Sequence, residues 1–496
     1  MSSESLDPST TGFSFLGDAA GDRFGYSVST AGDINGDGSP DIIIGAHSKE
    51  SYRGMVYVIY GGLNSSFSNF NLSQTALDPA TTGFTIRGHS TGNLLGLSVN
   101  TAGDINGDKY DDIIISAYLK DSIRGEVYVI YGKETSLLTN IDLSVTPLDP
   151  ASTGFTLKGY ASNNFFGYSV STSGDVNKDG FDDIIIGAFG FDSDRGAAYV
   201  IYGGTTATRT NIAFSSTTLD PASTGFMITG NAASDRLGRS VSNAGDINND
   251  GYDDIIIGAY QKDNSRGAVY VIYGGENSSL KNIDLSLATL NPASTGFTVL
   301  GSMMNEVLGY SARTVGDVNN DGYDDIIIGG NGRGRAYIIY GGKTSSFSNI
   351  ALASVTLDPA ITGFMITGNS LSDNFGVSVG TAGDVNGDGY DDIIIGGSGR
   401  NSNQGIAYVF YGGETSSRAH IDLSLTALDP ETMGFSITGD GIGDILGFSV
   451  STAGDINGDE YDDVIVGASK HNSDAGAAHL VYAGIWNYFY WIVMIF

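Results

Sequence analysis

The chain repeats one sequence unit seven times along its 496 residues. A Gly-Asp-Ile/Val-Asn string recurs at intervals of 71 residues, with one interval of 67. A Leu-Asp-Pro string, or Leu-Asn-Pro in one copy, opens the units at Leu6, Leu77, Leu148, Leu219, Leu290, Leu357 and Leu428. A repeat of this length restricts the fold to similar units packed side by side, either in an open solenoid or in a closed ring.

Each unit contains four short runs that are typical of β-strands. In the fourth copy they span residues 225–230, 238–245, 254–258 and 267–273. The last two are rich in β-branched and aromatic residues and lack polar alternation, which predicts strands buried on both faces. A strand buried in this way belongs to a sheet that packs between two neighbouring sheets.

We therefore predict an all-β fold, a seven-bladed β-propeller of four-stranded antiparallel blades. A closed ring leaves no apolar sheet face exposed at its ends, which favours it over the linear solenoid that is the structural alternative. The chain begins with a strand at residues 12–17, and the last unit ends at residue 482 without a strand after it. We expect the N-terminal strand to supply that missing edge and close the ring.

The repeats predict a single domain over residues 6–484. The units span about 6–76, 77–147, 148–218, 219–289, 290–356, 357–427 and 428–484. The apolar tail at 485–496 has a different composition, and it contains both tryptophans of the chain. Twelve residues are too few to cross a bilayer, so we interpret the tail as a truncated or mistranslated gene end, with an interfacial membrane anchor as the alternative.

An acidic loop of nine residues lies between the second and third runs of every unit. It reads Asp-x-Asn-x-Asp-x-x-x-Asp, so that side-chain oxygens stand at positions 1, 3, 5 and 9, and the backbone carbonyl of position 7 can join them. The candidate ligands are Asp33, Asn35, Asp37, Ser39 and Asp41; Asp104, Asn106, Asp108, Tyr110 and Asp112; Asp175, Asn177, Asp179, Phe181 and Asp183; Asp246, Asn248, Asp250, Tyr252 and Asp254; Asp317, Asn319, Asp321, Tyr323 and Asp325; Asp384, Asn386, Asp388, Tyr390 and Asp392; and Asp455, Asn457, Asp459, Tyr461 and Asp463.

This donor set predicts Ca²⁺, about one ion per blade and up to seven in all. Three carboxylates this close repel one another without a cation, and an all-oxygen set favours calcium over zinc or copper. The loop is not an EF-hand, because position 12 is Ile or Val rather than Glu. Lys109 and Glu460 replace the glycine of position 6, and Pro40 replaces an Asp beside the last ligand. The alternative is that Asp, Asn and Gly only form tight turns.

Charge and composition exclude several kinds of partner and chemistry. There are 56 acidic residues against 24 basic ones, a net charge of −32, which disfavours nucleic acid and anionic lipid as partners. Cysteine is absent, so thiol catalysis, thiolate metal sites and disulfides are excluded. Residues 1–8 are polar and show no signal-peptide core, and the sequence has no apolar run long enough for a transmembrane helix.

The repeats resemble the FG-GAP repeat of the integrin α-chain head. The Phe-Gly element reads Phe24-Gly25, Phe166-Gly167 and Phe375-Gly376, and it becomes Leu-Gly at Leu95, Leu237, Leu308 and Leu446. The Gly-Ala element stands at Gly45, Gly187, Gly258 and Gly467. This resemblance implies a seven-bladed propeller with calcium in the hairpin between the first two strands of a blade. It also implies an extracellular or cell-surface adhesion or protein-binding role, with a protein or glycan ligand on one loop face.

Adhesion has two functional alternatives. An enzyme is not expected, because His47, His89, His420, His471 and His479 are scattered without a repeated Ser or carboxylate partner; a non-catalytic propeller of a larger surface enzyme remains an alternative. A lectin needs aromatic residues at matching points of the blades, but Tyr26, Tyr168 and Tyr310 alternate with Leu97, Arg239, Val377 and Phe448. We interpret these tyrosines as core residues. Sequons at Asn64, Asn71 and Asn277 would permit glycosylation of a secreted chain, and the oligomeric state stays open.

Overall fold

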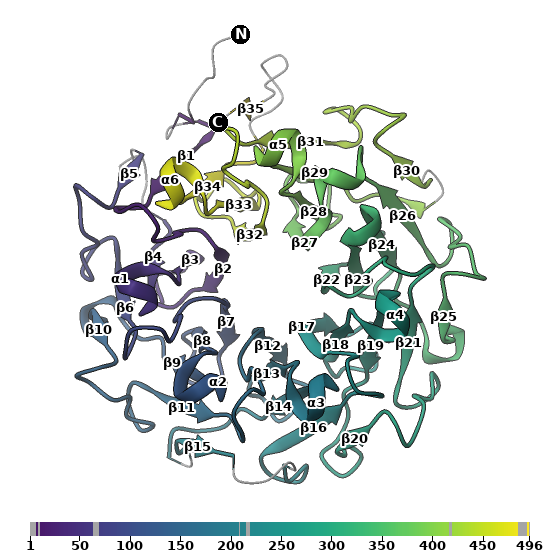
Figure 1. The fold of residues 1–496 in the computed structure, drawn as a ribbon, viewed down its shortest axis with the longest axis horizontal. Coiled ribbons are helices and arrows are strands. Elements are labelled where there is room, and N and C mark those ends of the chain that lie inside the picture. Colours follow the sequence, from purple (N-terminus) through teal and green to yellow (C-terminus); the bar gives the residue numbers. More distant parts are fainter. Residues whose placement is uncertain are drawn as a thin grey trace.

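A computed structural model shows seven sheets arranged as blades around a central axis (Figure 1). It describes residues 6–7, 10–62, 69–207, 209–214, 219–415, 419–484 and 494–495. The predicted all-β, seven-bladed propeller is confirmed. Within the described residues each sheet has five strands rather than four.

The strands of each blade run outward from the axis in a fixed order. They are β2(Ser27–Gly32), β3(Asp41–Ala46), β4(Met55–Ile59), β6(Gly83–Arg87) and β10(Ile141–Asp142); β7(Val99–Gly103), β8(Asp112–Ala117), β9(Glu126–Ile130), β11(Gly154–Lys158) and β15(Ile212–Ala213); β12(Val170–Gly174), β13(Asp183–Ala188), β14(Ala197–Ile201), β16(Gly225–Thr229) and β20(Ile283–Asp284); β17(Leu237–Gly245), β18(Asp254–Ala259), β19(Ala268–Ile272), β21(Gly296–Leu300) and β25(Ile350–Ala351); β22(Ser311–Gly316), β23(Asp325–Gly330), β24(Arg335–Ile339), β26(Gly363–Thr367) and β30(Ile421–Asp422); β27(Phe375–Gly383), β28(Asp392–Gly397), β29(Ile406–Phe410), β31(Gly434–Thr438) and β35(Met494–Ile495); and β32(Ser449–Gly454), β33(Asp463–Ala468), β34(Ala477–Val481), β1(Gly12–Leu16) and β5(Phe70–Asn71).

The first four strands of a blade are antiparallel, as predicted, and the fifth is a two-residue parallel strand at the rim. In the first blade, β10 pairs with β6 through Ile141 and Asp142. In five blades the fourth and fifth strands come from the next repeat along the chain; the blade of β27 takes β31 from the last repeat and β35 from the tail, and the blade of β32 takes β1 and β5 from the first repeat. Each repeat thus links two blades, and this exchange holds neighbouring blades together.

The N-terminal strand closes the ring, as the sequence predicted. β1 pairs antiparallel with β34 of the last repeat, from Gly12 opposite Val481 to Leu16 opposite Ala477. Phe13 and Phe15 in this strand are 1% and 0% exposed. The first and last repeats therefore share one blade, which is the seam of the ring.

The end of the apolar tail joins a blade as well. The backbone of β35 runs parallel to β31, with Met494 opposite Ile437 and Ile495 opposite Thr438. This is the rim position that two-residue strands such as β5 and β10 take in the other blades. Residues 485–493 and 496, to which the predictions of a gene end or membrane anchor also refer, lie outside the described residues.

Glycines of the two motif elements allow adjacent blades to approach through their backbones. A Cβ atom on Gly258 would lie 2.0 Å from the carbonyl oxygen of Gly309 in the next blade, and Gly309 itself has a φ of +81°. Ser240 donates a hydrogen bond of 3.0 Å to the same carbonyl. Side chains at these two points would force the sheets apart, which explains why the chain keeps Gly there.

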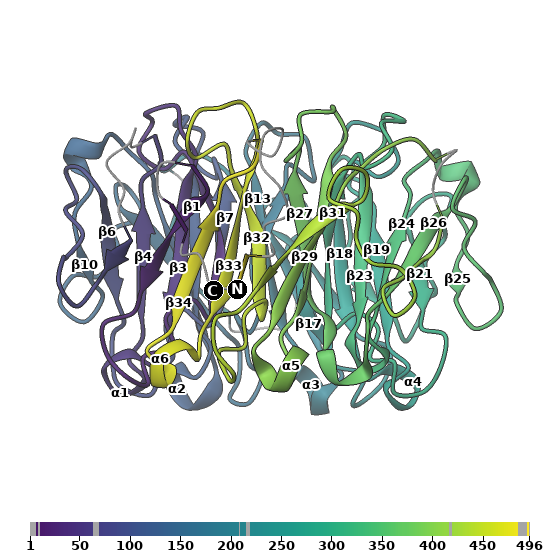
Figure 2. The ribbon, with the colours of Figure 1, turned by 90° about the horizontal axis from the view of Figure 1, so that it is seen from above.

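Short helical turns mark one face of the ring. They are α1(Lys49–Tyr52), α2(Lys120–Ile123), α3(Phe191–Asp194), α4(Lys262–Ser265), α5(Arg400–Asn403) and α6(His471–Asp474), with η1(Thr135–Leu137), η2(Asn331–Arg333), η3(Thr344–Ser346) and η4(Leu371–Asp373) elsewhere in the described chain. The α turns lie together along the lower edge of Figure 2 and follow the second strand of their blades. The acidic loops, at the other end of that strand, lie on the opposite face. We call these the helix face and the loop face.

The seam contains a histidine that predicts a pH dependence of stability. His479 in β34 lies opposite Ser14 of β1, and its Nδ1 atom lies 2.8 Å from the Ser14 hydroxyl. Burial, and then the charge of His471, lowers the pKa of His479 to about 3. Because the folded-state pKa lies below the unfolded value of about 6.5, stability is lost as the pH falls through 6.5.

We expect this histidine to cost about 2 kcal/mol of stability between pH 7 and pH 5. His479→Tyr should remove that loss, because blade six already pairs Tyr408 with Ser436 at the same place. Urea unfolding of both proteins at the two pH values measures the difference. The matched control is His89→Tyr, an exposed position where the next repeat carries Tyr160. If His479→Tyr lost as much stability on acidification as the parent, the assignment would be wrong.

Candidate metal-binding loops

The seven acidic loops connect the innermost strand of a blade to its second strand. The innermost strand ends on a Gly with a positive φ, such as Gly32 at +69°, and the last Asp of the loop begins the next strand. Each loop is therefore anchored at both ends by a rigid strand and lies on the loop face. All the predicted ligand positions lie in these connections.

The Asp at position 1 organises each loop by accepting backbone hydrogen bonds. In the first loop, Asp33 Oδ1 accepts the N–H of Asp37 at 3.0 Å, and its Oδ2 accepts the N–H of Gly38 at 2.9 Å. The same two bonds recur in the other six loops. A carboxylate has about four lone-pair directions, so these oxygens keep acceptor capacity for a cation.

The Asp at position 9 is the buried end of each loop. Asp41 is 0% exposed, as are its six counterparts. Its Oδ1 accepts the N–H of Gly61 at 2.8 Å, and its Oδ2 accepts the N–H of Ile34 at 3.0 Å. Burial, followed by the charges of Asp37 and Asp33, raises the pKa of Asp41 well above its usual range. Burial raises the pKa of Asp463 to about 8 in the same way. An ionised carboxylate at this point needs a nearby positive charge.

The Asn at position 3 differs among the loops. In the first loop, Asn35 donates to Asp37 Oδ2 at 3.0 Å and accepts from the Asp37 N–H at 2.8 Å. In three other loops the amide oxygens of Asn106, Asn248 and Asn319 are buried and have no hydrogen-bond partner. A buried oxygen without a hydrogen-bond partner lowers the stability of the fold, and coordination of a cation is one way to compensate for this loss.

Position 6 requires a backbone conformation that favours glycine. Gly38 has a φ of +90°, and Lys109 and Glu460, which replace this glycine, have φ values of +77° and +73°. These two loops keep the same hydrogen bonds as the others. The two substitutions therefore add backbone strain without changing the path of the loop.

An additional Asp at position 8, which the sequence analysis noted only as an acidic neighbour, joins adjacent loops. Asp111 Oδ2 accepts the N–H of Asp33 in the preceding blade at 2.8 Å. The same bond links Asp182 to Asp104 and Asp253 to Asp175, and it recurs between later blades. Pro40 takes this position in the first loop and packs against Gly454 across the seam.

The loops fit a hard divalent cation in their chemistry, and their acidic side chains are oriented by backbone bonds. Among the described residues, no three His, Asp or Glu side chains converge into a ready-made metal cage. The donor set is nevertheless all oxygen, one carboxylate is fully buried, and three loops contain an unsatisfied amide oxygen. These features match what Ca²⁺ takes as ligands.

Six segments of the chain match the FG-GAP repeat, at residues 24–59, 166–201, 237–272, 309–339, 375–410 and 446–481. Each segment runs from the Phe-Gly or Leu-Gly element through one acidic loop to the third strand of the blade. This is an FG-GAP repeat protein. The second blade lies outside the matched segments, yet its β7, β8 and β9 pair in the same register as their counterparts.

The FG-GAP propeller is similar to integrin α-chains. It is 30% identical over 249 residues to integrin alpha-V of Gallus gallus, which is 48% of this chain and 20% of that protein. It is 29% identical over 258 residues to integrin alpha pat-2 of Caenorhabditis elegans, which is 50% of this chain and 18% of that protein. The chain thus spans about a fifth of the length of these relatives. A crystal structure of Sqt1 from Chaetomium thermophilum covers 96% of this chain and 99% of its own, at 12% identity and a TM-score of 0.42.

The histidines of the FG-GAP propeller have separate structural surroundings. His47 is buried, with its ring 4.1 Å from that of Tyr26, and His471 pairs with Asp444 at 3.1 Å. His420 Nδ1 accepts the N–H of Met365, and His89 is exposed beside Ser90. His471 and His479 belong to the same blade, whereas His47, His89 and His420 lie elsewhere in the ring. In the part of the chain that the structure describes, no helix has the length and apolar character needed to cross a membrane.

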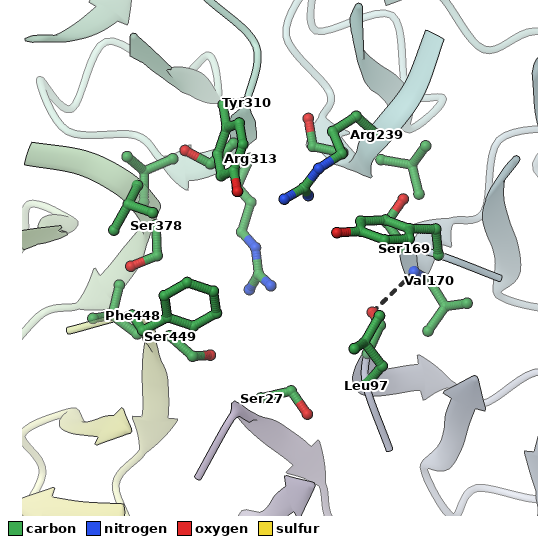
Figure 3. A pocket seen from close by; sticks show the side chains of 18 of the residues that line it. Ser27, Leu97, Ser169, Val170, Arg239, Tyr310, Arg313, Ser378, Phe448 and Ser449 are labelled. Carbon is green, nitrogen blue, oxygen red and sulfur yellow. Dashed lines mark hydrogen bonds between the residues drawn. The ribbon is translucent and has the colours of Figure 1, made fainter. Parts of the chain in front are cut away.

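The residues that follow the Phe-Gly element surround the axis at the helix face (Figure 3). The tyrosines among them, which the sequence predicts to be core residues, line an axial cavity together with Leu97, Arg239, Val377 and Phe448. Arg313, which was not predicted as a site residue, enters the same cavity. A signal was present, because four other repeats carry Ser at the position of Arg313. An arginine that replaces a small residue near the axis of the ring indicates that this position differs from its counterparts in the other repeats.

Proposed function

We propose that this FG-GAP propeller is a calcium-stabilised, non-enzymatic protein-binding module that acts in adhesion at a cell surface or outside the cell. The observation that carries the proposal is the recurrence of one oxygen donor set in all seven loops. The metal ligands are the side chains at positions 1, 3, 5 and 9 and the carbonyl of position 7. Residues 6–484 form the functional unit.

Calcium is supported by the physical state of the loops. The position-9 carboxylate is buried and has a raised pKa, so a bound cation would keep it ionised. The position-1 and position-5 carboxylates stand near it, and their backbone hydrogen bonds fix their direction before any ion arrives. Bound calcium would supply charge neutralisation and rigidity rather than chemistry on a substrate.

Protein binding is supported by the likeness to integrin α-chains and by the shape of the fold. Loops of a propeller are held on rigid blades and offer a broad surface on either face. The lectin alternative is weaker, because the seven residues around the axis include an arginine and three aliphatic or phenyl side chains and so do not repeat an aromatic platform. Adhesion thus remains the function that fits best.

The loop sites are tested by counting bound calcium. Equilibrium dialysis of the metal-stripped chain should give about seven ions at saturation, one per loop. Asp250→Asn keeps the acceptor for the Tyr252 N–H but removes a charge, so it should lower the count by about one. Asp263→Asn on α4 is the matched control, since other repeats carry Asn401 and Asn472 at this place. No binding at millimolar calcium, or equal counts for all three proteins, would refute the calcium sites.

The adhesive role has its own test. Beads coated with the full chain should bind to cells in calcium and detach in excess chelator, and the Asp263→Asn protein should behave like the parent. A glycan array run in parallel distinguishes sugar from protein recognition. Calcium-independent bead binding, or binding only to glycans, would contradict the proposed role even if all seven loops hold calcium.

A further inference from the structure

The axial cavity at the helix face has features that the calcium loops do not explain. It has a volume of about 170 Å³ and is lined by residues from the innermost strands of all seven blades. Figure 3 shows the side chains of Arg239 and Arg313 directed toward the axis from two neighbouring strands, β17 and β22. The cavity opens on the face opposite to the acidic loops.

Arg239 is held in place by two aromatic rings. Its guanidinium carbon lies 4.1 Å from the ring centroid of Tyr310 and 4.6 Å from that of Tyr168. Cation–π contacts of this kind fix the plane and direction of the guanidinium group. The N–H donors at the edge of the plane are left to point into the cavity.

Arg313 enters the cavity from deeper in the ring. It stands where the other innermost strands carry small residues, namely Ser29, Asn100, Ser171, Ser242, Gly380 and Ser451. Its side chain passes over Gly380, since a Cβ atom there would lie 3.7 Å from the Arg313 Cδ atom. Because Gly380 in the next blade has no side chain, there is space for the side chain of Arg313.

Neither guanidinium group has an acidic counterpart in the described part of the chain. Among the described residues, no carboxylate lies within 4.0 Å of Arg239 or Arg313, and none of the residues lining the cavity is acidic. Other cations on the helix face are paired, for example Lys49 with Asp22 at 2.7 Å and Arg400 with Asp373 at 3.2 Å. Burial lowers the pKa of Arg313, but a guanidinium group stays charged at neutral pH. Two positive charges thus share one cavity in a chain of net charge −32.

Hydroxyl groups add donors to the same wall. Ser98 Oγ accepts the N–H of Val170 at 3.1 Å, and Ser449 Oγ accepts the N–H of Val28 at 3.0 Å. Each of these hydroxyls therefore keeps its proton for donation. The volume corresponds to about five or six water molecules at roughly 30 Å³ each, which is enough for a small oxyanion.

We propose that the axial cavity binds one small oxyanion, a carboxylate, sulfate or phosphate group, between the guanidinium groups of Arg239 and Arg313. Guanidinium donors match the geometry of such groups and bind them through charge-assisted hydrogen bonds. The oxyanion is either a free ion or the acidic side chain of a bound protein. The site does not depend on the proposed calcium loops, which lie on the other face.

The test measures binding of sulfate and of succinate by calorimetry, in a chloride-free buffer, to the full chain with and without calcium. Arg239→Leu and Arg313→Ser copy the residues that the chain carries at Leu97 and Ser171, so both variants have a precedent in the fold. Each should weaken binding at least tenfold, and the double variant should abolish it. Arg87→Thr is the matched control, because it removes an exposed arginine of the same face and copies Thr229.

Location is tested separately by soaking crystals in selenate and looking for an anomalous peak between the two arginines. A peptide with one internal Asp, compared with its Asn counterpart, tests the protein source; binding of this peptide alone, lost in the two variants, also supports the site. Far-ultraviolet circular dichroism verifies that each variant is folded. Should none of the probes bind at tens of millimolar, or should the folded double variant bind as tightly as Arg87→Thr, the proposal is overturned.

Discussion

A chain that begins at Asp18, and so lacks β1, is expected to be unfolded or aggregated at 25 °C. The deletion removes five antiparallel pairings with β34 and the fully buried rings of Phe13 and Phe15. Loss of a buried Phe side chain typically costs about 3–5 kcal/mol, and two of them rival the 5–15 kcal/mol that stabilises a typical domain. The deletion would also expose β34 as an edge strand, which promotes aggregation.

The measurement is size-exclusion chromatography and thermal unfolding of the shortened chain, with a deletion of residues 1–5 as the control. The control should melt with the parent, because it leaves β1 intact. A peptide spanning residues 6–17, added to the shortened chain, should restore part of the melting temperature by pairing with β34. A shortened chain that melts within about 2 °C of the parent would show that another contact closes the ring.

The seam depends on β1 more than a comparison of the repeats suggests. Between the first and second blades, Asp111 bonds to the backbone of the preceding loop, and later blades repeat this link. Across the seam Pro40 replaces that Asp, so the corresponding link from Asp455 is not made through this position. The shared blade of β34 and β1 is therefore the largest paired segment between the two ends of the chain, beside single bonds such as that from the Gly62 N–H to the Ile456 carbonyl oxygen.

Strong repetition explains how much of the fold could be predicted from the sequence. Seven copies of an Ile-rich run and a Tyr-rich run predict buried strands, and the unpaired run at residues 12–17 predicts the closure through Phe13 and Phe15. The rim strands were not predicted, because two residues such as Ile141–Asp142 carry no periodic signal. The short α turns were missed for a similar reason, and they contain left-handed residues such as Glu50 and Ser51 that no helix propensity indicates.

The candidate sites also divide into a part that the sequence predicts and a part that it does not. The spacing of the acidic motif alone predicts the oxygen donors of the loops. A simple turn needs only one or two such residues, whereas every copy keeps four. Spacing gave no information on burial, so the difference between fully buried Asp41 and partly exposed Asp33 emerged only from the fold. Arg239 and Arg313 lie in different repeats and at different positions, and only the packing of adjacent blades around the axis brings them together. Such a site consists of residues that differ from their counterparts in the other repeats. An alignment of the repeats therefore does not show that these residues lie together.

Removal of calcium is expected to lower the melting temperature of the full chain by more than about 15 °C at neutral pH. A ligand present at 100 times its dissociation constant stabilises the folded state by about 2.7 kcal/mol per site. Seven occupied loops would then contribute about 19 kcal/mol, and because a chain of this length has an unfolding entropy of about 1 kcal/mol per kelvin, this corresponds to a shift of more than about 15 °C. Without the ions, the seven fully buried aspartates, such as Asp183 and Asp254, face neighbouring carboxylates with no cation between them.

The measurement is differential scanning calorimetry of protein stripped with excess chelator, with elemental analysis to prove that metal is absent. Calcium added back should restore the original transition, and magnesium should restore less, because Mg²⁺ demands six ligands at shorter distances and gives up its water reluctantly. Asp250→Asn should melt lower than the parent in calcium but match it after stripping, since the lost ligand matters only when an ion is bound. An unchanged transition in protein proved to be free of metal would mean that hydrogen bonds alone stabilise the loops, and that the carboxylates serve as turn residues.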